Sequence, residues 1–141
     1  MKGCSLVVKS RFSTLPFIMV ELLIIKPSSL GDIIHALQVA TSLKSQLKGL
    51  RISWISREVF APIVEASDVV DQVYIFERNG GTKGFLRMMK EVRRTKFDYV
   101  FDMQGLLRTG LMISRTRSDF KVGRSDSREM SEMFYDEKVP L

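Results

Sequence analysis

Residues 20–37, with the sequence VELLIIKPSSLGDIIHAL, decide the fold class. The run VELLIIK is almost continuously apolar and rich in branched side chains, which is typical of a strand buried on both faces of a sheet. PSSLGD follows as a turn and a helix start, where Ser28 or Ser29 can cap the helix and Asp32 lies in its first turn. From Asp32 to about Leu47, apolar residues recur with the period of an amphipathic helix. The stretch therefore predicts a buried strand followed by a helix.

The same alternation continues along the chain. Further strands are expected at 51–56, at 71–76, within 96–105 and at 119–123, and helices at 57–67, 85–94 and 106–114. Gly49 is expected to end the first long helix and Pro62 to interrupt the short one, whereas 77–84 is expected to be the least ordered stretch. The polar residues after 123 are expected to end without a closing element. This pattern predicts an α/β fold, with a parallel sheet, helices on both faces and right-handed crossovers.

The composition indicates one globular domain with a core of its own. The chain has 141 residues, of which 45% are hydrophobic and 27% are charged, so it is not a disordered chain. Lysine and arginine number 22 against 16 aspartate and glutamate, a formal net charge of +6. Such an excess suits a polyanionic partner or an anionic membrane surface, or it serves solubility alone.

Several classes of protein are excluded or disfavoured. The single cysteine, Cys4, cannot form an internal disulfide, which fits a reducing compartment such as the cytoplasm. Together with the single histidine, His35, it cannot make a zinc site of the usual Cys/His kind. No apolar run reaches the ~20 residues of a membrane span. Aromatic residues do not interleave with basic ones, so no nucleic-acid partner is expected.

The start of the chain is expected to lie outside the domain. Residues 1–18 lack the long apolar stretch and the cleavage site of a signal peptide. We therefore expect a leader that is disordered or not native, with Met19 as the working start and a domain over 19–141.

Ligands of parallel α/β sheets bind beyond the carboxyl ends of the strands, so the loops there are the candidate site. The first loop, KPSSLGD, has neither the P-loop spacing nor the GxGxxG pattern. Gly31 nevertheless lets the backbone approach a ligand, and the free amides of the helix attract anions. Asp32 has two interpretations, since a carboxylate in the first turn can stabilise the helix or do chemistry. His35 is expected to be a packing or hydrogen-bonding residue.

The loop after the fourth strand repeats this arrangement, with Asp102, Gln104 and Gly105 followed by Arg108. In the local interpretation Asp102 caps the next helix and Gln104 closes the turn. In the functional one they form a polar wall facing Asp32, and the spacing does not choose between the two. The basic residues near these edges are Arg57, Arg78, Lys83, Arg87, Arg108, Arg124, Arg128 and Lys138.

Three segments together resemble a known family. LLIIKPSSLGDIIHAL, Trp54 in the second strand and FDYVFDMQGLLRTGL are similar to the amino-terminal half of the ADP-heptose:lipopolysaccharide heptosyltransferases, glycosyltransferase family 9. SREMSEMFYDEKVPL resembles the family's segment leading out of its acceptor-side sheet. The resemblance implies a GT-B architecture of two Rossmann-like domains, of which this chain is the amino-terminal, acceptor-binding one. It also implies metal-independent, inverting transfer of heptose from ADP-heptose to the lipopolysaccharide inner core, with ADP-heptose as a substrate and with neither a metal nor a cofactor.

By motif match, Asp32 would be the general base that takes the proton from the acceptor hydroxyl. Ser28, Ser29 and Gly31 would shape the loop around it, while Asp102, Gln104 and Gly105 would line the same cleft. Basic loop residues, Arg108 and Arg128 among them, would hold the acceptor's negative groups. An inverting displacement needs such a base, together with stabilisation of the departing diphosphate on the opposite side.

Family members are roughly twice as long as this chain, and the donor-binding half has no counterpart here. The chain alone is therefore expected to be inactive, as a truncation, a gene fragment or half of a split enzyme. Its expected partners are the inner-core acceptor, the missing carboxyl-terminal donor domain and, peripherally, the anionic inner face of the inner membrane. The alternative is a non-catalytic α/β module that binds an anionic glycan or a phospholipid head group. A nucleotide-binding α/β protein is the third interpretation, disfavoured because no phosphate-loop glycine pattern occurs.

Overall fold

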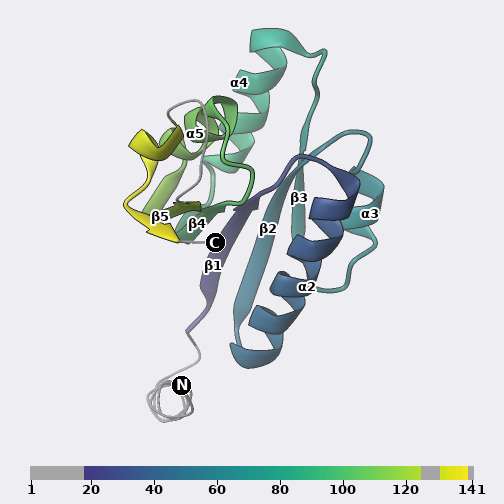
Figure 1. Cartoon of the computed structure of the whole chain (residues 1–141), viewed down its shortest axis with the longest axis vertical. Coiled ribbons are helices and arrows are strands. Elements are labelled where there is room, and N and C mark those ends of the chain that lie inside the picture. Colours follow the sequence, from purple (N-terminus) through teal and green to yellow (C-terminus); the bar gives the residue numbers. More distant parts are fainter. Residues whose placement is uncertain (1–17, 125–130, 140–141) are drawn as a thin grey trace.

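The computed structural model describes residues 18–124 and 131–139. Six strands form one sheet in the order β3-β2-β1-β4-β5-β6, and every neighbouring pair is parallel (Figure 1). The strands are β1 Val20–Ile25, β2 Leu50–Arg57, β3 Gln72–Phe76, β4 Lys96–Asp102, β5 Arg117–Arg124 and β6 Glu137–Val139. The predicted α/β class and parallel sheet are confirmed. Residues 1–17 of the expected leader and Arg128 lie outside the described ranges.

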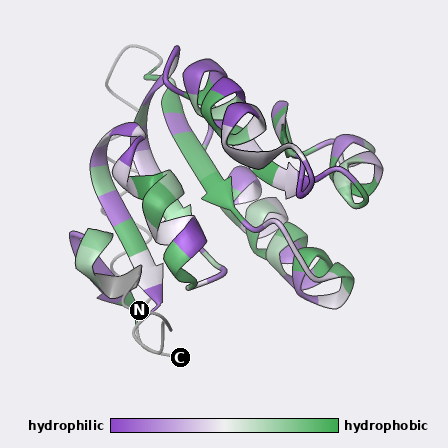
Figure 2. Cartoon of the chain, turned by 90° about the horizontal axis from the view of Figure 1, so that it is seen from above, coloured by the Kyte–Doolittle hydropathy of each residue, from purple (hydrophilic) through white to green (hydrophobic). Residues whose placement is uncertain are grey.

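Helices cover both faces of the sheet (Figures 1 and 2). The described ones are α2 Leu30–Gln46, α3 Ala61–Glu65, α4 Gly81–Val92, α5 Leu107–Ser114 and the 3₁₀ turn η1 Ser131–Phe134. Buried residues of α2 and α3 pack on one face, and those of α4 and α5 pack on the other. The two layers follow from β1, whose alternate residues point to opposite faces. Leu22 and Ile24 belong to the first core, while Leu23 and Ile25 belong to the second.

Local predictions near proline and glycine were partly wrong. Pro62 does not interrupt a helix but lies in the first turn of α3, where its missing amide hydrogen is not needed. The paired glycines of 77–84 are not a loosely ordered stretch either. Gly80 caps α4, and Gly81 begins it with a φ of 59°. Helix α2 already ends at Gln46, and Gly49, with a φ of 83°, serves the turn into β2.

The sequence also failed to predict β6. Its three residues are exposed, so they show no apolar pattern, and backbone pairing with Val122–Arg124 makes the strand. Asp136 adds to this edge, because its carboxylate accepts a hydrogen bond from the amide of Lys121 at 2.8 Å and its own amide donates to the carbonyl of Lys121 at 2.7 Å. The polar end of the chain therefore does close the sheet.

The order of the strands places the site. The chain moves outward from β1 through β2 to β3, and then returns to place β4 on the other side of β1. Adjacent loops diverge at such a switch point and leave a crevice at the carboxyl ends of β1 and β4. There Ile25 lies beside Asp102 in the register, and the amide of Met103 donates to the carbonyl of Ile25 at 3.1 Å.

Candidate active site

Asp32 lies in the first turn of α2, the helix that follows the carboxyl end of β1. Its Oδ2 accepts hydrogen bonds from the hydroxyl of Ser29 at 2.9 Å and from the backbone amide of Ser29 at 3.5 Å. Ser29 is the capping residue of the helix, so part of this contact stabilises the helix start, as the structural interpretation predicts. The Asp32 side chain is still 58% exposed. The carboxylate is therefore neither turned inward nor covered by its own chain.

Lys26 lies beneath Asp32, and the sequence did not single it out. It follows β1 directly, its side chain is 6% exposed, and its Nζ lies 3.7 Å from Oδ2 of Asp32. Burial lowers the pKa of Lys26, while the nearby carboxylate of Asp32 opposes that shift. The hydrogen bond from Ser29 and the positive charge of Lys26 lower the pKa of Asp32. A lysine that ends an otherwise apolar strand was the signal available in the sequence.

Asp102 is buried under the loop that follows β4. Its Oδ1 accepts hydrogen bonds from the amides of Gln104 and Gly105 at 2.9 and 3.0 Å. Its Oδ2 accepts from the hydroxyls of Thr109 and Tyr135 at 2.8 and 2.6 Å. At 2% exposure, Asp102 organises the loop and the start of α5. These contacts agree with the local interpretation of Asp102, and none of them involves Asp32.

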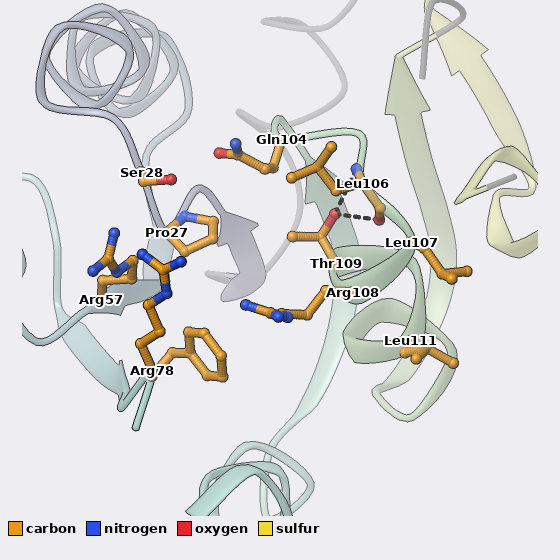
Figure 3. A pocket seen from close by; sticks show the side chains of 11 residues that line it. Pro27, Ser28, Arg57, Arg78, Gln104, Leu106, Leu107, Arg108, Thr109 and Leu111 are labelled. Carbon is orange, nitrogen blue, oxygen red and sulfur yellow. Dashed lines mark hydrogen bonds between the residues drawn. The ribbon is translucent and has the colours of Figure 1, made fainter. Parts of the chain in front are cut away.

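A hollow of about 560 Å³ opens beside the first loop (Figure 3). It is lined by Pro27, Ser28, Arg57, Phe76, Arg78, Gln104, Leu106, Leu107, Arg108, Thr109 and Leu111. The structure thus brings together three predicted acceptor residues, Ser28, Gln104 and Arg108. Of the other predicted residues that it describes, Ser29, Gly31, Asp32, Asp102 and Gly105 are outside this lining.

Three arginines give the hollow its charge. Arg57 ends β2, Arg78 follows β3, and Arg108 lies in the first turn of α5 (Figure 3). The guanidinium of Arg57 lies 5.9 Å from the ring centre of Phe60, and that of Arg108 lies 5.6 Å from the ring centre of Phe76. Guanidinium groups suit phosphate and carboxylate through paired hydrogen bonds.

Two buried polar atoms at the hollow lack a hydrogen-bond partner within the described residues. They are Nε of Arg57, a donor, and Oε1 of Gln104, an acceptor. Buried polar atoms are normally paired, so unpaired ones at a hollow mark positions that a bound ligand can satisfy. The first loop is itself held in place, because the amide of Arg57 donates to the carbonyl of Pro27 at 3.1 Å. The hollow is therefore lined by a loop held by a backbone hydrogen bond, and it contains one donor and one acceptor that a ligand could pair with.

Within residues 18–124 and 131–139, no group of three or more His, Cys, Asp or Glu side chains is placed to hold a metal ion. In the same part of the chain, no helix is long and apolar enough to cross a membrane.

No protein-family model matches the chain. Curated relatives include lipopolysaccharide heptosyltransferase 1 of Salmonella typhimurium strain LT2, 29% identical over 130 residues, which cover 84% of this chain and 41% of the relative. The protein of the same name from Campylobacter coli is 28% identical over 125 residues, covering 86% of this chain and 36% of the relative. The lipopolysaccharide core heptosyltransferase OpsX of Haemophilus influenzae is 23% identical, covering 84% and 35%. The chain thus spans about four tenths of the length of the curated relatives it matches.

Solved structures show the same fold. E. coli heptosyltransferase WaaC with ADP-2-deoxy-2-fluoro heptose superposes with a TM-score of 0.76 at 23% identity, over 86% of this chain and 42% of that one. The glycosyl transferase family 9 protein from Veillonella parvula DSM 2008 gives 0.77 at 16% identity, over 89% and 37%. The resemblance predicted from the motifs is therefore confirmed: this chain is similar in sequence to the lipopolysaccharide heptosyltransferases and has the α/β fold of their GT-B structures over the part that matches.

Proposed function

We propose that this chain is the acceptor-side domain of a heptosyltransferase-like, inverting glycosyltransferase. The proposed reaction transfers heptose from ADP-heptose to the inner core of lipopolysaccharide. One observation carries the proposal: the loop between β1 and α2 contributes Ser28 to a hollow lined by three arginines, and four residues later the first turn of α2 carries Asp32, an exposed carboxylate whose pKa is lowered. The similarity to named heptosyltransferases supports it.

Asp32 would act as the general base. The acceptor hydroxyl attacks the anomeric carbon of the donor, its proton passes to the Asp32 carboxylate, and the nucleoside diphosphate leaves from the opposite face. The lowered pKa of Asp32 keeps the carboxylate ionised at neutral pH, so it is ready to accept a proton. A carboxylate is also a weak base, so the proton moves late, as the new bond to the hydroxyl oxygen forms.

The hollow would orient the acceptor. Its volume, about 560 Å³, lies in the range of small-molecule sites, which is about 300–1,000 Å³. Arg57, Arg78 and Arg108 would bind carboxylate or phosphate groups of the inner core, and Gln104 and Ser28 would bind hydroxyls. Such contacts hold the reacting hydroxyl in position, a contribution separate from proton transfer. Gly31 and Ser29 would serve by shaping the loop that carries Asp32.

The donor would be bound mainly by a second domain, which faces this one across the crevice in the proposed enzyme. The proposal also implies a cytoplasmic protein that touches the anionic inner face of the inner membrane. The net charge of +6 supports that contact, because basic residues are attracted to anionic lipids.

Reconstitution tests the proposal. We would join this chain to the donor domain of a related heptosyltransferase and measure heptose transfer to inner-core acceptor. Asp32→Asn and Asp32→Ala should each lower the rate by at least about 100-fold, the usual contribution of a general base. Asp68→Asn, which changes an exposed carboxylate of the loop after α3, serves as the control and should leave the rate unchanged. An Asp32→Asn enzyme as fast as the parent would remove Asp32 from the chemistry.

The three arginines also suit the alternative, a non-catalytic module that binds an anionic glycan or a phospholipid head group. Titration of the chain with phosphorylated inner-core saccharide, and separately with vesicles containing anionic lipid, distinguishes the two ligands. Glycan binding without transfer activity in the reconstituted enzyme would favour the module. An affinity that salt does not weaken would contradict an electrostatic site in either case.

A further inference from the structure

The two oxygens of the Asp32 carboxylate have different surroundings. Oδ2 accepts both hydrogen bonds from Ser29, at 2.9 Å from the hydroxyl and 3.5 Å from the amide. The same Oδ2 faces Nζ of Lys26 at 3.7 Å. Within the described residues, no hydrogen bond or ion pair reaches Oδ1 of Asp32. With the side chain 58% exposed, one oxygen is anchored and the other is open to an incoming group.

Lys26 is held in a fixed place below this carboxylate. Its backbone carbonyl accepts a hydrogen bond from the indole Nε1 of Trp54 at 3.1 Å, which ties the end of β1 to β2. Its side chain is 6% exposed, so the ammonium group is largely shielded from solvent. Lys26 forms its ion pair with Asp32, so we expect an effect of Lys26 on the reaction to pass through Asp32.

The charges around Lys26 make Asp32 its nearest described counter-ion. Asp32 forms the ion pair, and Asp102 adds a weaker attraction from beneath the neighbouring loop. The positive charge of Arg124, at the end of β5, repels that of Lys26 and lowers the pKa of Lys26. Asp102 already accepts four hydrogen bonds, from two amides and two hydroxyls, so its oxygens are occupied. A buried ammonium without a close carboxylate would be costly, which favours a lasting contact with Asp32.

We propose that Lys26 is a positioning residue for the proposed transfer reaction: together with Ser29 it anchors Oδ2 of Asp32, so that Oδ1 is the atom that accepts the proton of the acceptor hydroxyl. This inference rests on the proposed function of Asp32. In the step, the O–H bond of the acceptor breaks as its oxygen bonds to the anomeric carbon, and the proton goes to Oδ1. The bond between that carbon and the diphosphate oxygen breaks, and its electron pair leaves with the diphosphate.

Anchoring one oxygen has two consequences. The hydrogen bonds and the ion pair at Oδ2 restrict rotation of the carboxylate, so Oδ1 keeps one direction. A fixed direction lowers the entropic cost of reaching the reactive geometry. The positive charge of Lys26 also stabilises the ionised carboxylate over its protonated form. Asp32 therefore returns to the ionised state after each transfer.

The test uses the 141-residue chain. The carboxyl carbon of Asp32 is titrated by NMR in the parent, in Lys26→Met and in Ser29→Ala. Each substitution should raise the proton affinity of Asp32, by roughly three- to fivefold for Lys26→Met, as for a partly exposed ion pair. The matched control is Lys44→Met, since Lys44 lies 2.6 Å from Asp71. That variant should raise the proton affinity of Asp71 and leave Asp32 unchanged.

An Asp32 titration that is the same in Lys26→Met as in the parent would overturn the proposal. If Lys26→Met does not fold, Asp32→Asn answers the same question, because the proton affinity of the Lys26 amine should then fall. An unchanged Lys26 amine in that variant would overturn the proposal as well. The titrations need no turnover, so they are separate from the test of function. A shifted Asp32 in a reconstituted enzyme that Asp32→Asn leaves active would overturn the proposed function and the proton-accepting role of Oδ1, but not the anchoring.

Discussion

The hydroxyl of Tyr135 donates a 2.6 Å hydrogen bond to Oδ2 of Asp102, a residue 33 positions earlier in the chain. Tyr135 follows η1, while Asp102 ends β4, so the contact joins the last described segment to the centre of the sheet. The ring of Tyr135 reaches Asp102 by lying against Gly123 of β5. A residue outside the predicted site thus supports the loop that carries Gln104 and leads into α5, where Arg108 lies.

Gly123→Ala should destabilise the protein. A methyl group at this position would overlap the Tyr135 ring, and moving the ring would weaken its hydrogen bond to Asp102. We expect a loss of about 1–3 kcal/mol in the free energy of unfolding, measured by urea denaturation. Gly84→Ala in α4 is the control, since nothing lies within 4 Å of the added carbon, and it should stabilise by about 0.5–1 kcal/mol. Equal stability of Gly123→Ala and the parent would contradict the role of the ring.

Asp32 should contribute to stability in a pH-dependent manner. Its pKa in the folded chain is lowered by Ser29 and Lys26 from an ordinary value of 3.8, so the folded state favours the ionised form. The contribution is therefore fully present above about pH 4 and is lost as the pH falls through the folded pKa. Urea denaturation of the parent and Asp32→Asn should show a difference at pH 7 that shrinks below pH 4. A difference that stays constant or grows on acidification would show that the pKa is not lowered.

Lys26→Met should stabilise the isolated chain near neutral pH. Burial is the largest cause of the lowered pKa of Lys26, so the folded state disfavours its charged form despite Asp32. The unfolded chain then binds more protons at this site, and stability rises with pH as the pH approaches and passes the folded pKa. Replacement by an apolar side chain should add up to about 2 kcal/mol at pH 7, and less in alkaline solution. Thermal unfolding at pH 7 and pH 10 measures both values, and a destabilised Lys26→Met at pH 7 would contradict a net cost of burial.

Arg57, Arg78 and Arg108 should each contribute to anion binding. Replacing any one of them by Ala should weaken the binding of phosphorylated inner-core saccharide by about tenfold, because a charged hydrogen-bond donor to the anion is lost. Calorimetric titration at low and raised salt measures the affinity and its screening. Arg94→Ala is the charge-matched control, since Arg94 pairs with Glu91 at the end of α4, away from the hollow. Equal losses in the control and the hollow variants would show that net charge alone is responsible.

Much of the fold was predictable because its signals are local. Buried parallel strands are apolar throughout, as in VELLII of β1, and α2 shows helical periodicity after a serine cap. Where packing or backbone pairing decides, the prediction failed. The exposed residues of β6 carry no strand pattern, and Pro62 was compatible with the start of a helix as well as with its interruption.

The site divides in the same way. The sequence alone determined that Asp32 begins a helix after a buried strand, and that arginines follow strands whose carboxyl ends share one edge of the sheet. The tertiary structure decided that Asp102 is buried and accepts hydrogen bonds from Thr109 and Tyr135. It also decided that Arg57, Arg78 and Arg108 line one hollow, and that Nζ of Lys26 lies 3.7 Å from Oδ2 of Asp32. The physical reason is distance along the chain. Helix caps and hydrophobic periodicity involve residues a few positions apart, whereas burial and ion pairing between distant residues depend on which strands become neighbours in the sheet.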